Sequence, residues 1–411
     1  MTAPAPAQPA LPRQVDVAIV GGGMVGATLA LLLVNEARVR AGQIVLVEPR
    51  PVSPPAAGSA PGLRVSAIAP ANRARLADLG VWDRMDATRI ARVERMAVWH
   101  EAVPPDSPDV LRFDAAESGA PELGCIVEND ALQAALMQAC RERGIVILND
   151  SLQALAIHPG EARLQLGLAR VDAQLVVGAD GAASTVRELM QMPATMREYG
   201  QRGIVATITT GRSHRGTAFQ RFLGTGPLAL LPLPGNTCSI VWSATEARAV
   251  ELLAMPAEQF NNELTAASAG VLGALELASE RASFPLRRLA AGSYVAPRVA
   301  LVGDAAHVIH PLAGQGVNQG LEDAVALAAQ LAARPPRESV GALRALRRYE
   351  RERRAGNALV GEVVDGLDRL FTGSGPLTAW AAREAMALVG RLPFARRFLA
   401  GKAAGQARPR A

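Results

Sequence analysis

The longest hydrophobic pattern in the chain is an uncharged run over residues 17–34. Its eighteen residues are just enough to span a membrane. Four glycines interrupt the run, at 21–23 and 26, and no basic leader with a small-residue cleavage site precedes it. The pattern therefore predicts a strand over 15–20, a glycine turn and a helix over about 24–35, followed by a second strand over 44–47.

The turn between this strand and this helix carries the spacing Gly-x-Gly-x-x-Gly. Glycines at this spacing allow a tight turn, close approach of a pyrophosphate and close packing of helix on strand, and the helix N-terminus attracts phosphate. Glu48 ends the second strand, near the position of an acid that binds a ribose hydroxyl. We predict an adenine-dinucleotide site, the alternative being a glycine turn in an ordinary βαβ unit. Its predicted contacts are Gly21, Gly23, Met24, Val25, Gly26 and Glu48.

Two later segments also predict a buried strand that ends in a turn containing glycine and aspartate. Residues 175–178 precede Asp180-Gly181, and residues 299–302 precede Gly303-Asp304. Apolar or alternating stretches between Gly and Pro residues predict further strands at 204–209, 229–233 and 238–242. From residue 339 to about 399 the pattern becomes helical and rich in arginine.

Residues 303–324 allow three kinds of chemistry. Asp304, His307 and His310 are spaced at i, i+3 and i+6, as in some metal sites, but the intervening Gly and Pro residues prevent them from sharing one helix face. A hydrolase relay would need a GxSxG elbow, which the sequence lacks. A third interpretation, which we favour, is a cradle for a cofactor made by Gly314-Gln315-Gly316 at the start of a helix. No metal is expected.

Composition narrows the class of protein. A chain of 411 residues with 49% apolar and 20% charged residues is long enough for two or three globular domains, or for one large α/β unit with an insertion. The only lysine is Lys402, which excludes a Walker GK[ST] motif and a Schiff-base lysine in the motif regions. The three cysteines form no CxxC, which favours a reducing compartment.

Charge is uneven along the chain. From Arg334 onward there are 16 basic and 7 acidic residues. This region is expected either to be a solvated helical surface or to contact an anionic membrane face or acidic partner. No nucleic-acid motif accompanies the charge. We expect a cytoplasmic protein, with contact at the inner membrane left open, and no signal peptide or transmembrane helix.

Three blocks in this order, GxGxxG, then "GADG", then "VGDAAH", resemble the class A flavoprotein aromatic monooxygenases, the para-hydroxybenzoate hydroxylase class. Within that class the chain most resembles the ubiquinone-biosynthesis hydroxylases of the UbiH/UbiF/UbiI group. The closer match rests on "LGCIVENDALQAAL", "GPLALLPLPG", "FPLRRL" and "HPLAGQGVNQGLEDA". The resemblance implies FAD as cofactor and NAD(P)H or another electron donor as reductant. NAD(P)H would visit transiently, because no second GxGxxG occurs in strand–turn–helix context.

The resemblance also implies an α/β fold in which a Rossmann-like FAD-binding domain is assembled from separated segments. Its predicted pieces are 14–91, 116–195 and 281–335. A β-sheet substrate domain is expected from 92–115 and 196–280, and C-terminal helices over 336–400. The ends, 1–13 and 401–411, are expected to be disordered.

Roles for individual residues follow from the same resemblance. Asp304 would bind the flavin ribityl chain, the alternative being a helix cap, and Gly314–Gly316 would face the pyrimidine end of the ring. Asp180-Gly181 would lie near FAD and the nicotinamide unless it is a plain turn, and Arg64 would lie near the flavin phosphates unless it is a surface residue. His307 would support the GD motif. His310 and Pro311 would border the hydroxylation pocket. The chain departs from the family pattern at Asp130, Gln319 and Glu322.

The function implied is hydroxylation of the ring of a polyprenylated phenol in ubiquinone biosynthesis by O₂, through a flavin C4a-hydroperoxide. The expected partners also include a ubiquinone-biosynthesis complex and the membrane surface, which the protein would contact peripherally. One alternative is another flavoenzyme of the fold, either a prenyl reductase or a halogenase. A halogenase would need an active-site lysine, for which Lys402 is badly placed. Another is an FAD-binding scaffold subunit without turnover.

Overall fold

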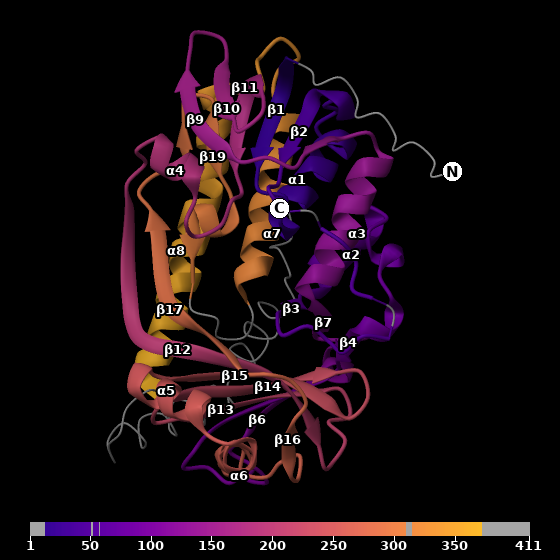
Figure 1. Ribbon diagram of the computed structural model, residues 1–411, viewed down its shortest axis with the longest axis vertical. Helices are drawn as coiled ribbons and strands as arrows, with labels where there is room; N and C mark the ends of the chain where they lie inside the picture. The colour runs from indigo at the N-terminus through magenta and orange to yellow at the C-terminus, as the bar shows by residue number, and fades with distance from the viewer. Residues whose placement is uncertain (1–12, 51, 57, 310–314, 372–411) are drawn as a thin grey trace.

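Two sheets, one above the other, organise the computed structural model, which describes residues 13–371 apart from 51, 57 and 310–314. The upper sheet is largely parallel and is packed by helices, whereas the lower sheet is broad and largely antiparallel (Figure 1). A small third sheet joins them on one side. The expected α/β class is confirmed.

The upper sheet has the strand order β18-β19-β11-β1-β2-β8, and its strands from β19 to β8 are parallel. The hairpin strands β9 and β10 extend it from β11. In Figure 1 the parallel strands run downward, so their carboxyl ends face the lower sheet. The bounds are β1 Gln14–Val20, β2 Ile44–Val47, β8 Val146–Leu148, β9 Leu152–Ile157, β10 Ala162–Leu166, β11 Arg170–Gly178, β18 Val295–Ala296 and β19 Val299–Leu301.

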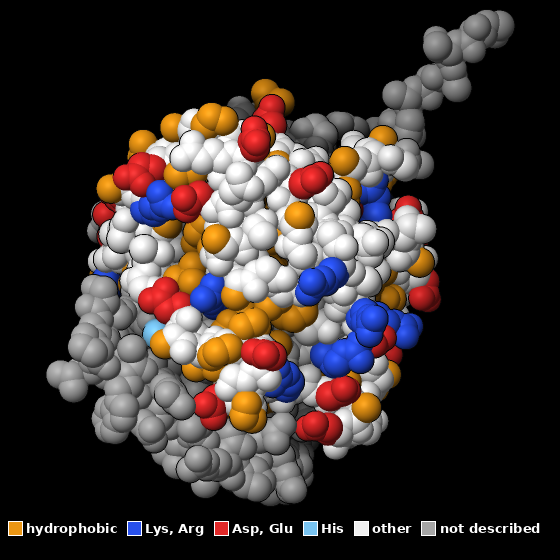
Figure 2. All heavy atoms as spheres, turned by 90° about the horizontal axis from the view of Figure 1, so that it is seen from below, with side chains coloured by type: hydrophobic (Ala, Val, Ile, Leu, Met, Phe, Trp, Pro, Cys, Tyr) orange, Lys and Arg blue, Asp and Glu red, His pale blue; other side chains and the backbone are white. Residues whose placement is uncertain are grey.

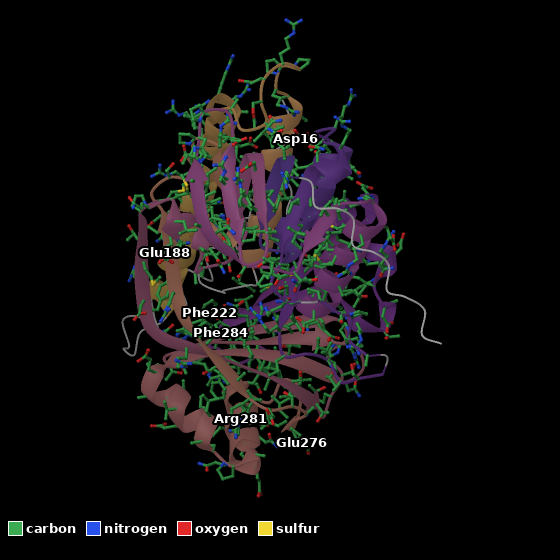
Figure 3. All side chains as sticks on the ribbon, turned by 45° about the horizontal axis from the view of Figure 1, so that its top comes forward. Asp16, Glu188, Phe222, Glu276, Arg281 and Phe284 are labelled. Atoms are coloured by element: carbon green, nitrogen blue, oxygen red, sulfur yellow. The ribbon has the colours of Figure 1, made fainter. Side chains whose placement is uncertain are left out.

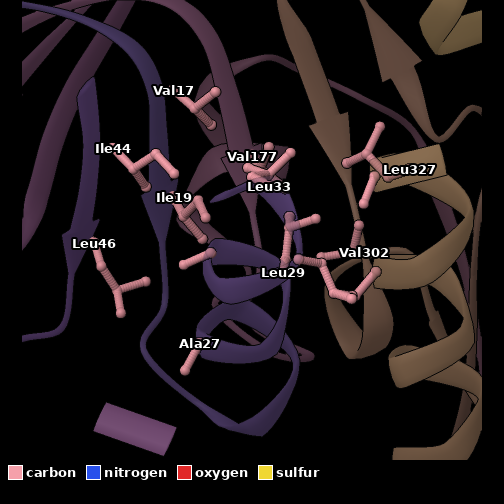
Figure 4. Close-up of a cluster of buried hydrophobic side chains, with 14 of the residues drawn as sticks. Val17, Ile19, Ala27, Leu29, Leu33, Ile44, Leu46, Val177, Val302 and Leu327 are labelled. Atoms are coloured by element: carbon pink, nitrogen blue, oxygen red, sulfur yellow. The ribbon is translucent and has the colours of Figure 1, made fainter. Parts of the chain in front are cut away.

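Helix α1 lies at the centre of the upper unit, between the sheet and helix α7 (Figure 4). The helix is apolar on every side, as expected for a fully buried helix. Side chains from five helices and strands, and one from the turn after β19, meet there and are at most 1% exposed: Val17, Ile19, Leu29, Leu33, Ile44, Leu46, Val177, Val302 and Leu327. The helices of this unit are α1 Met24–Asn35, α3 Asn129–Glu142, α4 Thr185–Leu189 and α7 Gln315–Ala332.

The lower sheet has the order β20-β17-β12-β15-β14-β13-β5-β6, with β16 beside β12. Helices α5 (Glu246–Ala254) and α6 (Ala257–Ala267) cover its underside through a core that includes Ile240, Trp242 and Phe260. Figure 2 shows this side of the molecule, where acidic and basic side chains surround apolar ones. The strands are β5 Arg95–His100, β6 Leu111–Asp114, β12 Ala194–Thr210, β13 Thr217–Leu223, β14 Gly226–Leu233, β15 Thr237–Thr245, β16 Leu275–Leu277, β17 Ala282–Ala291 and β20 His307–Val308.

Two features connect the upper and lower sheets. The small sheet β3-β7-β4 packs on the lower sheet, and helix α2 adjoins it. Helix α8 starts beside β18 and α7 and continues to the lower sheet, where Glu362 pairs with Arg288 of β17 at 2.9 Å. The bounds are β3 Val65–Ile68, α2 Pro70–Asp78, β4 Ile90–Val93, β7 Gly124–Glu128 and α8 Leu343–Phe371.

The hydrophobic pattern predicted the first elements closely: the strand expected at 44–47 and the helix expected at 24–35 have these bounds in the structure. The strand expected at 204–209 is much longer, because β12 begins at Ala194. Its first five residues mix apolar and polar side chains, are all exposed and pair with β17, so their sequence gave no strand pattern. No helix in the described part of the chain is long and apolar enough to cross a bilayer.

Candidate cofactor and substrate site

The motifs found in the sequence meet at one edge of the upper sheet. The glycine turn follows β1, Glu48 follows β2, Asp180 follows β11 and Asp304 lies just beyond β19. These four strands are neighbours and parallel, so their carboxyl ends lie side by side. That edge is where open α/β sheets bind their ligands.

The glycines of the first turn differ in what surrounds their Cβ positions. Gly21 has a φ of +106°, and a Cβ there would lie 2.3 Å from the Ala179 carbonyl oxygen. A Cβ on Gly26 would lie 2.0 Å from the Gly21 carbonyl oxygen. The fold itself therefore requires both glycines. By contrast, a Cβ on Gly23 would meet no protein atom within 4 Å, so protein packing does not explain this glycine and the predicted contact with a pyrophosphate remains a prediction.

Gly23 is also the N-cap residue of α1. It has no side chain that could accept a hydrogen bond from the first N–H groups of the helix. No acidic residue lies in the first turn of α1. The positive end of the helix dipole is therefore open to an anion. Met24 and Val25 start the helix, and Val25 packs against Gly303 and Gly320, where added Cβ atoms would lie 3.3 and 2.6 Å from its Cγ2.

Glu48 is buried at the end of β2, with 7% of its surface exposed. Its Oε2 accepts a hydrogen bond from the Gly22 N–H at 2.9 Å, and its Oε1 accepts one from the Arg50 N–H at 3.2 Å. These contacts fix the carboxylate beside the glycine turn. Each oxygen keeps a second acceptor position, so a ribose contact remains a prediction.

Asp304 follows Gly303, whose φ of +60° turns the chain at the sheet edge. The side chain of Asp304 is reachable by solvent, yet enough protein surrounds it that lost hydration raises the pKa of its carboxyl. The charges of His307 and Arg64 oppose that rise. Arg64 is exposed, and no described residue pairs with its guanidinium. An acid and an arginine thus share one part of the edge without a direct bond between them.

Replacing Asp304 by asparagine should weaken FAD binding without destabilising the apoprotein. Because the folded-state pKa is raised, the carboxylate costs stability above its unfolded pKa of about 3.9, and this cost disappears in acid. The amide removes the cost at neutral pH but donates and accepts differently toward a polyol, so we expect about tenfold weaker FAD binding. Thermal unfolding of the apoprotein and titration with FAD would measure the two effects. A clear loss of apoprotein stability at pH 7 would contradict this account.

Asp180 makes two hydrogen bonds within its own turn. Its carboxylate accepts from Ser184 Oγ at 2.5 Å and from the Val186 N–H at 3.1 Å, at the start of α4. The side chain of Asp180 therefore acts as it would in a plain turn. Gly181, with a φ of +82° and open space at its Cβ position, leaves the backbone free to approach a ligand, so contact with a cofactor remains a prediction.

Arg187 joins the two aspartate turns, a role that the sequence did not reveal. Its Nη2 donates to the Ala182 carbonyl at 2.7 Å, and its Nη1 donates to the Ala305 carbonyl at 2.8 Å. The segment after β11 and the segment after β19 are therefore held together by one side chain. A sequence shows an arginine at the start of a helix, but not the carbonyl it reaches 118 residues away.

Asp323, on α7, anchors the segment that carries Asp304. It is fully buried, and its Oδ2 accepts from the Gly303 N–H at 3.0 Å and contacts His307 Nε2 at 2.5 Å. Its Oδ1 accepts from Arg353 Nε at 2.7 Å and from Asn357 Nδ2 at 3.2 Å. Burial opposes ionisation, but His307 and Arg353 outweigh it and hold the pKa of Asp323 below its ordinary value.

His307 thus supports the GD turn: it is buried, bonds to Asp323 and stacks on Tyr294 with ring centroids 5.7 Å apart. Among the residues that the structure describes, no three His, Cys, Asp or Glu side chains converge as metal ligands would.

Two of the three departures from the family pattern share one explanation. Arg353 Nη1 donates to Glu322 Oε2 at 3.0 Å, and Arg353 Nη2 donates to Gln319 Oε1 at 3.0 Å. Both residues therefore join α7 to α8 through the arginine that also binds Asp323. Asp130 is exposed in the first turn of α3, where a negative charge favours the helix dipole. The structure shows no further reason for it.

The start of α7 resembles the start of α1. The helix begins at Gln315, has no acidic residue in its first turn, and has open space at the Cβ position of Gly316. Asn318 fixes this turn: its Oδ1 accepts from the Ala69 N–H at 2.9 Å and its Nδ2 donates to the Ala67 carbonyl at 2.7 Å. The other residues predicted for this cradle and for the pocket edge, Gly314, His310 and Pro311, lie outside the described residues.

Comparison with known proteins bears on this arrangement. Residues 14–362 match the family described as FAD binding domain. The chain is 37% identical over 389 residues to ubiquinone hydroxylase UbiL of Rhodospirillum rubrum, an alignment that spans 93% of this chain and 88% of the relative. It is 38% identical over 362 residues to 3-demethoxyubiquinol 3-hydroxylase of Escherichia coli, spanning 87% and 89% of the two chains. The chain belongs to the FAD-dependent monooxygenases.

Solved structures confirm the flavoprotein fold. The p-nitrophenol 4-monooxygenase PnpA of Pseudomonas putida superposes with a TM-score of 0.75 at 18% identity, covering 97% of this flavoprotein and all of the other chain. PqsL of P. aeruginosa, in complex with 2-aminobenzoylacetate, gives a TM-score of 0.74 at 23% identity and covers 90% of this chain and all of its own.

The residues of this flavoprotein fit FAD. The two helix N-termini lack acidic residues, and open space surrounds the Cβ positions of Gly23 and Gly316. The two helices meet at Gly303, because Val25 of α1 and Gly320 of α7 pack around it. A pyrophosphate suits the α1 start, and a ring whose N1–C2=O end gains negative charge on reduction suits the α7 start.

Proposed function

We propose that this flavoprotein hydroxylates the aromatic ring of a polyprenylated phenol in ubiquinone biosynthesis. The observation that carries the proposal is the place of the motifs: the parallel strand ends and the α7 start face the lower sheet. Two paired rows of that sheet, from Val205 to Gln220 and from Gly203 to Phe222, contain no charged residue. The names of the R. rubrum and E. coli relatives, with nine-tenths of the chain aligned to the first, support the pathway.

In this proposal the protein binds and orients, and FAD when bound supplies the activation of O₂. One oxygen atom enters the ring, and the other leaves as water after two electrons and two protons are delivered. Glu48 and the α1 start would hold the adenosine and phosphates, Asp304 the ribityl chain, and the α7 start the ring. The closely packed glycines and the Arg187 and Asp323 contacts keep this frame rigid.

The proposed reductant is NAD(P)H, which would visit transiently. The single glycine fingerprint in the sequence supports this, since a second bound dinucleotide would need its own site. Arg64, exposed near Asp304 and without a described partner, offers a positive charge for its phosphates.

The test is reconstitution followed by turnover. The purified protein should take up one FAD, turn yellow, and consume O₂ when NAD(P)H and a short-chain prenylphenol are added. Protein that cannot be loaded with FAD would overturn the proposal. Full FAD occupancy without O₂ consumption would instead favour a scaffold subunit.

We further propose that α8 brings the protein to an anionic membrane face. Arg344, Arg347, Arg348 and Arg351 follow the i, i+3, i+4, i+7 spacing of one helix face and line one hollow. In the described part of the chain none of these four arginines has an ion pair, and two nitrogens of Arg348 are buried without a hydrogen-bond partner. Like charges at this spacing repel unless an anion lies among them.

Vesicle binding checks this proposal. The protein should sediment with vesicles that contain phosphatidylglycerol. Replacing both Arg347 and Arg351 by alanine should reduce the fraction of protein bound several-fold, at about 1 kcal/mol per charge. The control removes two exposed arginines elsewhere, Arg38 and Arg40. Equal loss in both double variants, or equal binding to neutral phosphatidylcholine, would contradict it, and failure to bind vesicles would leave an acidic protein as the partner of this face.

A further inference from the structure

The upper side of the lower sheet is defined by the strand register. Gln220 pairs with Ala229, Ala229 with Val241, and Val241 with Val205. Directly paired residues point to the same side of a sheet. Their neighbours in sequence, among them Ile204, Leu230 and Ile240, belong to the core with α5 and α6 on the underside. The row from Val205 to Gln220 therefore faces the upper sheet and its motifs.

Hydrophobic packing between described residues accounts for only part of this side. Ala218 and Leu231, two residues along the same side, pack on Ile126 and Val93 of the small sheet. Beyond that contact, Val205, Ala229 and Val241 belong to none of the hydrophobic clusters among the described residues, although Val205 is only 9% exposed. Apolar side chains in such a position form the wall of a site for an apolar ligand.

Gln220 is the exception in this apolar row. It is 5% exposed, yet its side-chain amide forms no hydrogen bond with any described residue. Neither polar atom of this amide is among the fully buried side-chain atoms without a partner, so the end of the side chain stays open to water or to a ligand while the rest of the residue is buried. The amide can donate and accept, and so suits a hydroxyl, a carbonyl or an ether oxygen.

The surroundings of Gln220 carry no formal charge. The next row of the same side contains Phe222, Pro227, Ser243 and Gly203, and the ring of Phe284 lies over Gly203, where an added Cβ would be 2.9 Å from Cζ. In Figure 3, Phe222 and Phe284 lie on the side toward the upper sheet, and Arg281 and Glu276 lie on the opposite side. Within the described rows from Val205 to Gln220 and from Gly203 to Phe222, no Arg, Lys, Asp or Glu occurs.

We infer that Gln220 is a specificity-determining residue, which binds a neutral oxygen substituent of the ring while Val205, Ala229 and Val241 contact its apolar part. The inference rests on the proposed function and narrows the substrate to an uncharged ring. An aromatic carboxylate would be rejected, because a buried anion without a cation among these side chains would be costly.

The experiment compares two ligands of the FAD-loaded protein: a short-chain 2-prenylphenol and the matching prenylbenzene, which lacks the hydroxyl. Binding is followed by the change in the visible flavin spectrum. The wild type should prefer the phenol, and Gln220→Leu should lower that preference about tenfold, since a site with a polar partner discriminates strongly against an analogue that lacks it. Gln153→Leu, the same change on an exposed part of β9, should leave it unaltered.

The outcomes separate the two proposals. A wild-type protein that binds FAD but neither ligand overturns the proposed function and the inference with it. A wild type that prefers the phenol, with a Gln220→Leu variant that keeps the preference, overturns the inference alone. Equal weakening toward both ligands would also contradict it, because that result indicates disturbed packing. Gln220→Glu should weaken phenol binding as the pH rises through the pKa of the introduced carboxyl, which burial raises above its ordinary value.

Discussion

Replacing Gly26 by alanine is expected to destabilise the apoprotein by about 3 kcal/mol or more and to abolish FAD binding. The added Cβ would lie 2.0 Å from the Gly21 carbonyl oxygen and 3.1 Å from the Ala179 Cβ. Both neighbours are fixed, one by backbone and one by the packed strand end, so the strain cannot be relieved by rotating a side chain. Urea unfolding of the apoprotein would measure the loss.

Gly23→Ala is the matched variant, and it separates folding from binding. Its Cβ would meet no protein atom within 4 Å, and Gly23 has a φ of −68°, which alanine adopts readily. We therefore expect an apoprotein of unchanged stability with FAD affinity lowered by about tenfold or more. A Gly23→Ala protein that binds FAD normally would contradict the placement of the phosphates at the start of α1.

Replacing Asp323 by alanine is expected to cost about 3–5 kcal/mol of unfolding free energy, the usual loss when one member of a buried ion pair is removed. Arg353, His307 and the Gly303 N–H would lose a common partner. The turn that carries Asp304 would then be held less firmly, so FAD affinity should also fall. Arg351→Ala, an exposed arginine on the same helix, is the control and should change neither stability nor FAD affinity.

The charge of Asp323 predicts a pH dependence. Because its folded-state pKa lies below the ordinary value, its stabilising effect is fully present above the unfolded pKa, about 3.9, and is lost as the pH falls through the lower folded pKa. Asp323→Asn keeps the shape but removes the charge. Its stability deficit should therefore shrink below about pH 4. A deficit that grows in acid would contradict the assigned ion pair.

The local parts of this site could be predicted from sequence because their physical causes are local. Gly26 is required by its contact with the Gly21 carbonyl in the same turn, and α1 is apolar on every side, so its bounds could be located from the pattern. The strands that lead to Asp180 and Asp304 were recognisable for the same reason. Their meeting at one edge followed only once their parallel order was known.

The remaining parts depend on contacts between residues far apart in the chain. In the sequence Arg353 is one of many arginines in α8, and nothing there indicates that it binds Asp323, Gln319 and Glu322. Gln220 reads as a polar residue in an ordinary strand. Its importance depends on the register that places it beside Ala229 and Val241, and a shift of one residue would turn it to the underside.

The most direct test of the proposed function is oxygen transfer itself. The FAD-loaded protein would be given NAD(P)H, a short-chain prenylphenol and ¹⁸O₂, and the product analysed by mass spectrometry. The account predicts a hydroxylated ring carrying one atom of ¹⁸O, formed only when both FAD and reductant are present. A product labelled from water, or full FAD loading with reductant consumed and no hydroxylated ring, would contradict the proposed function.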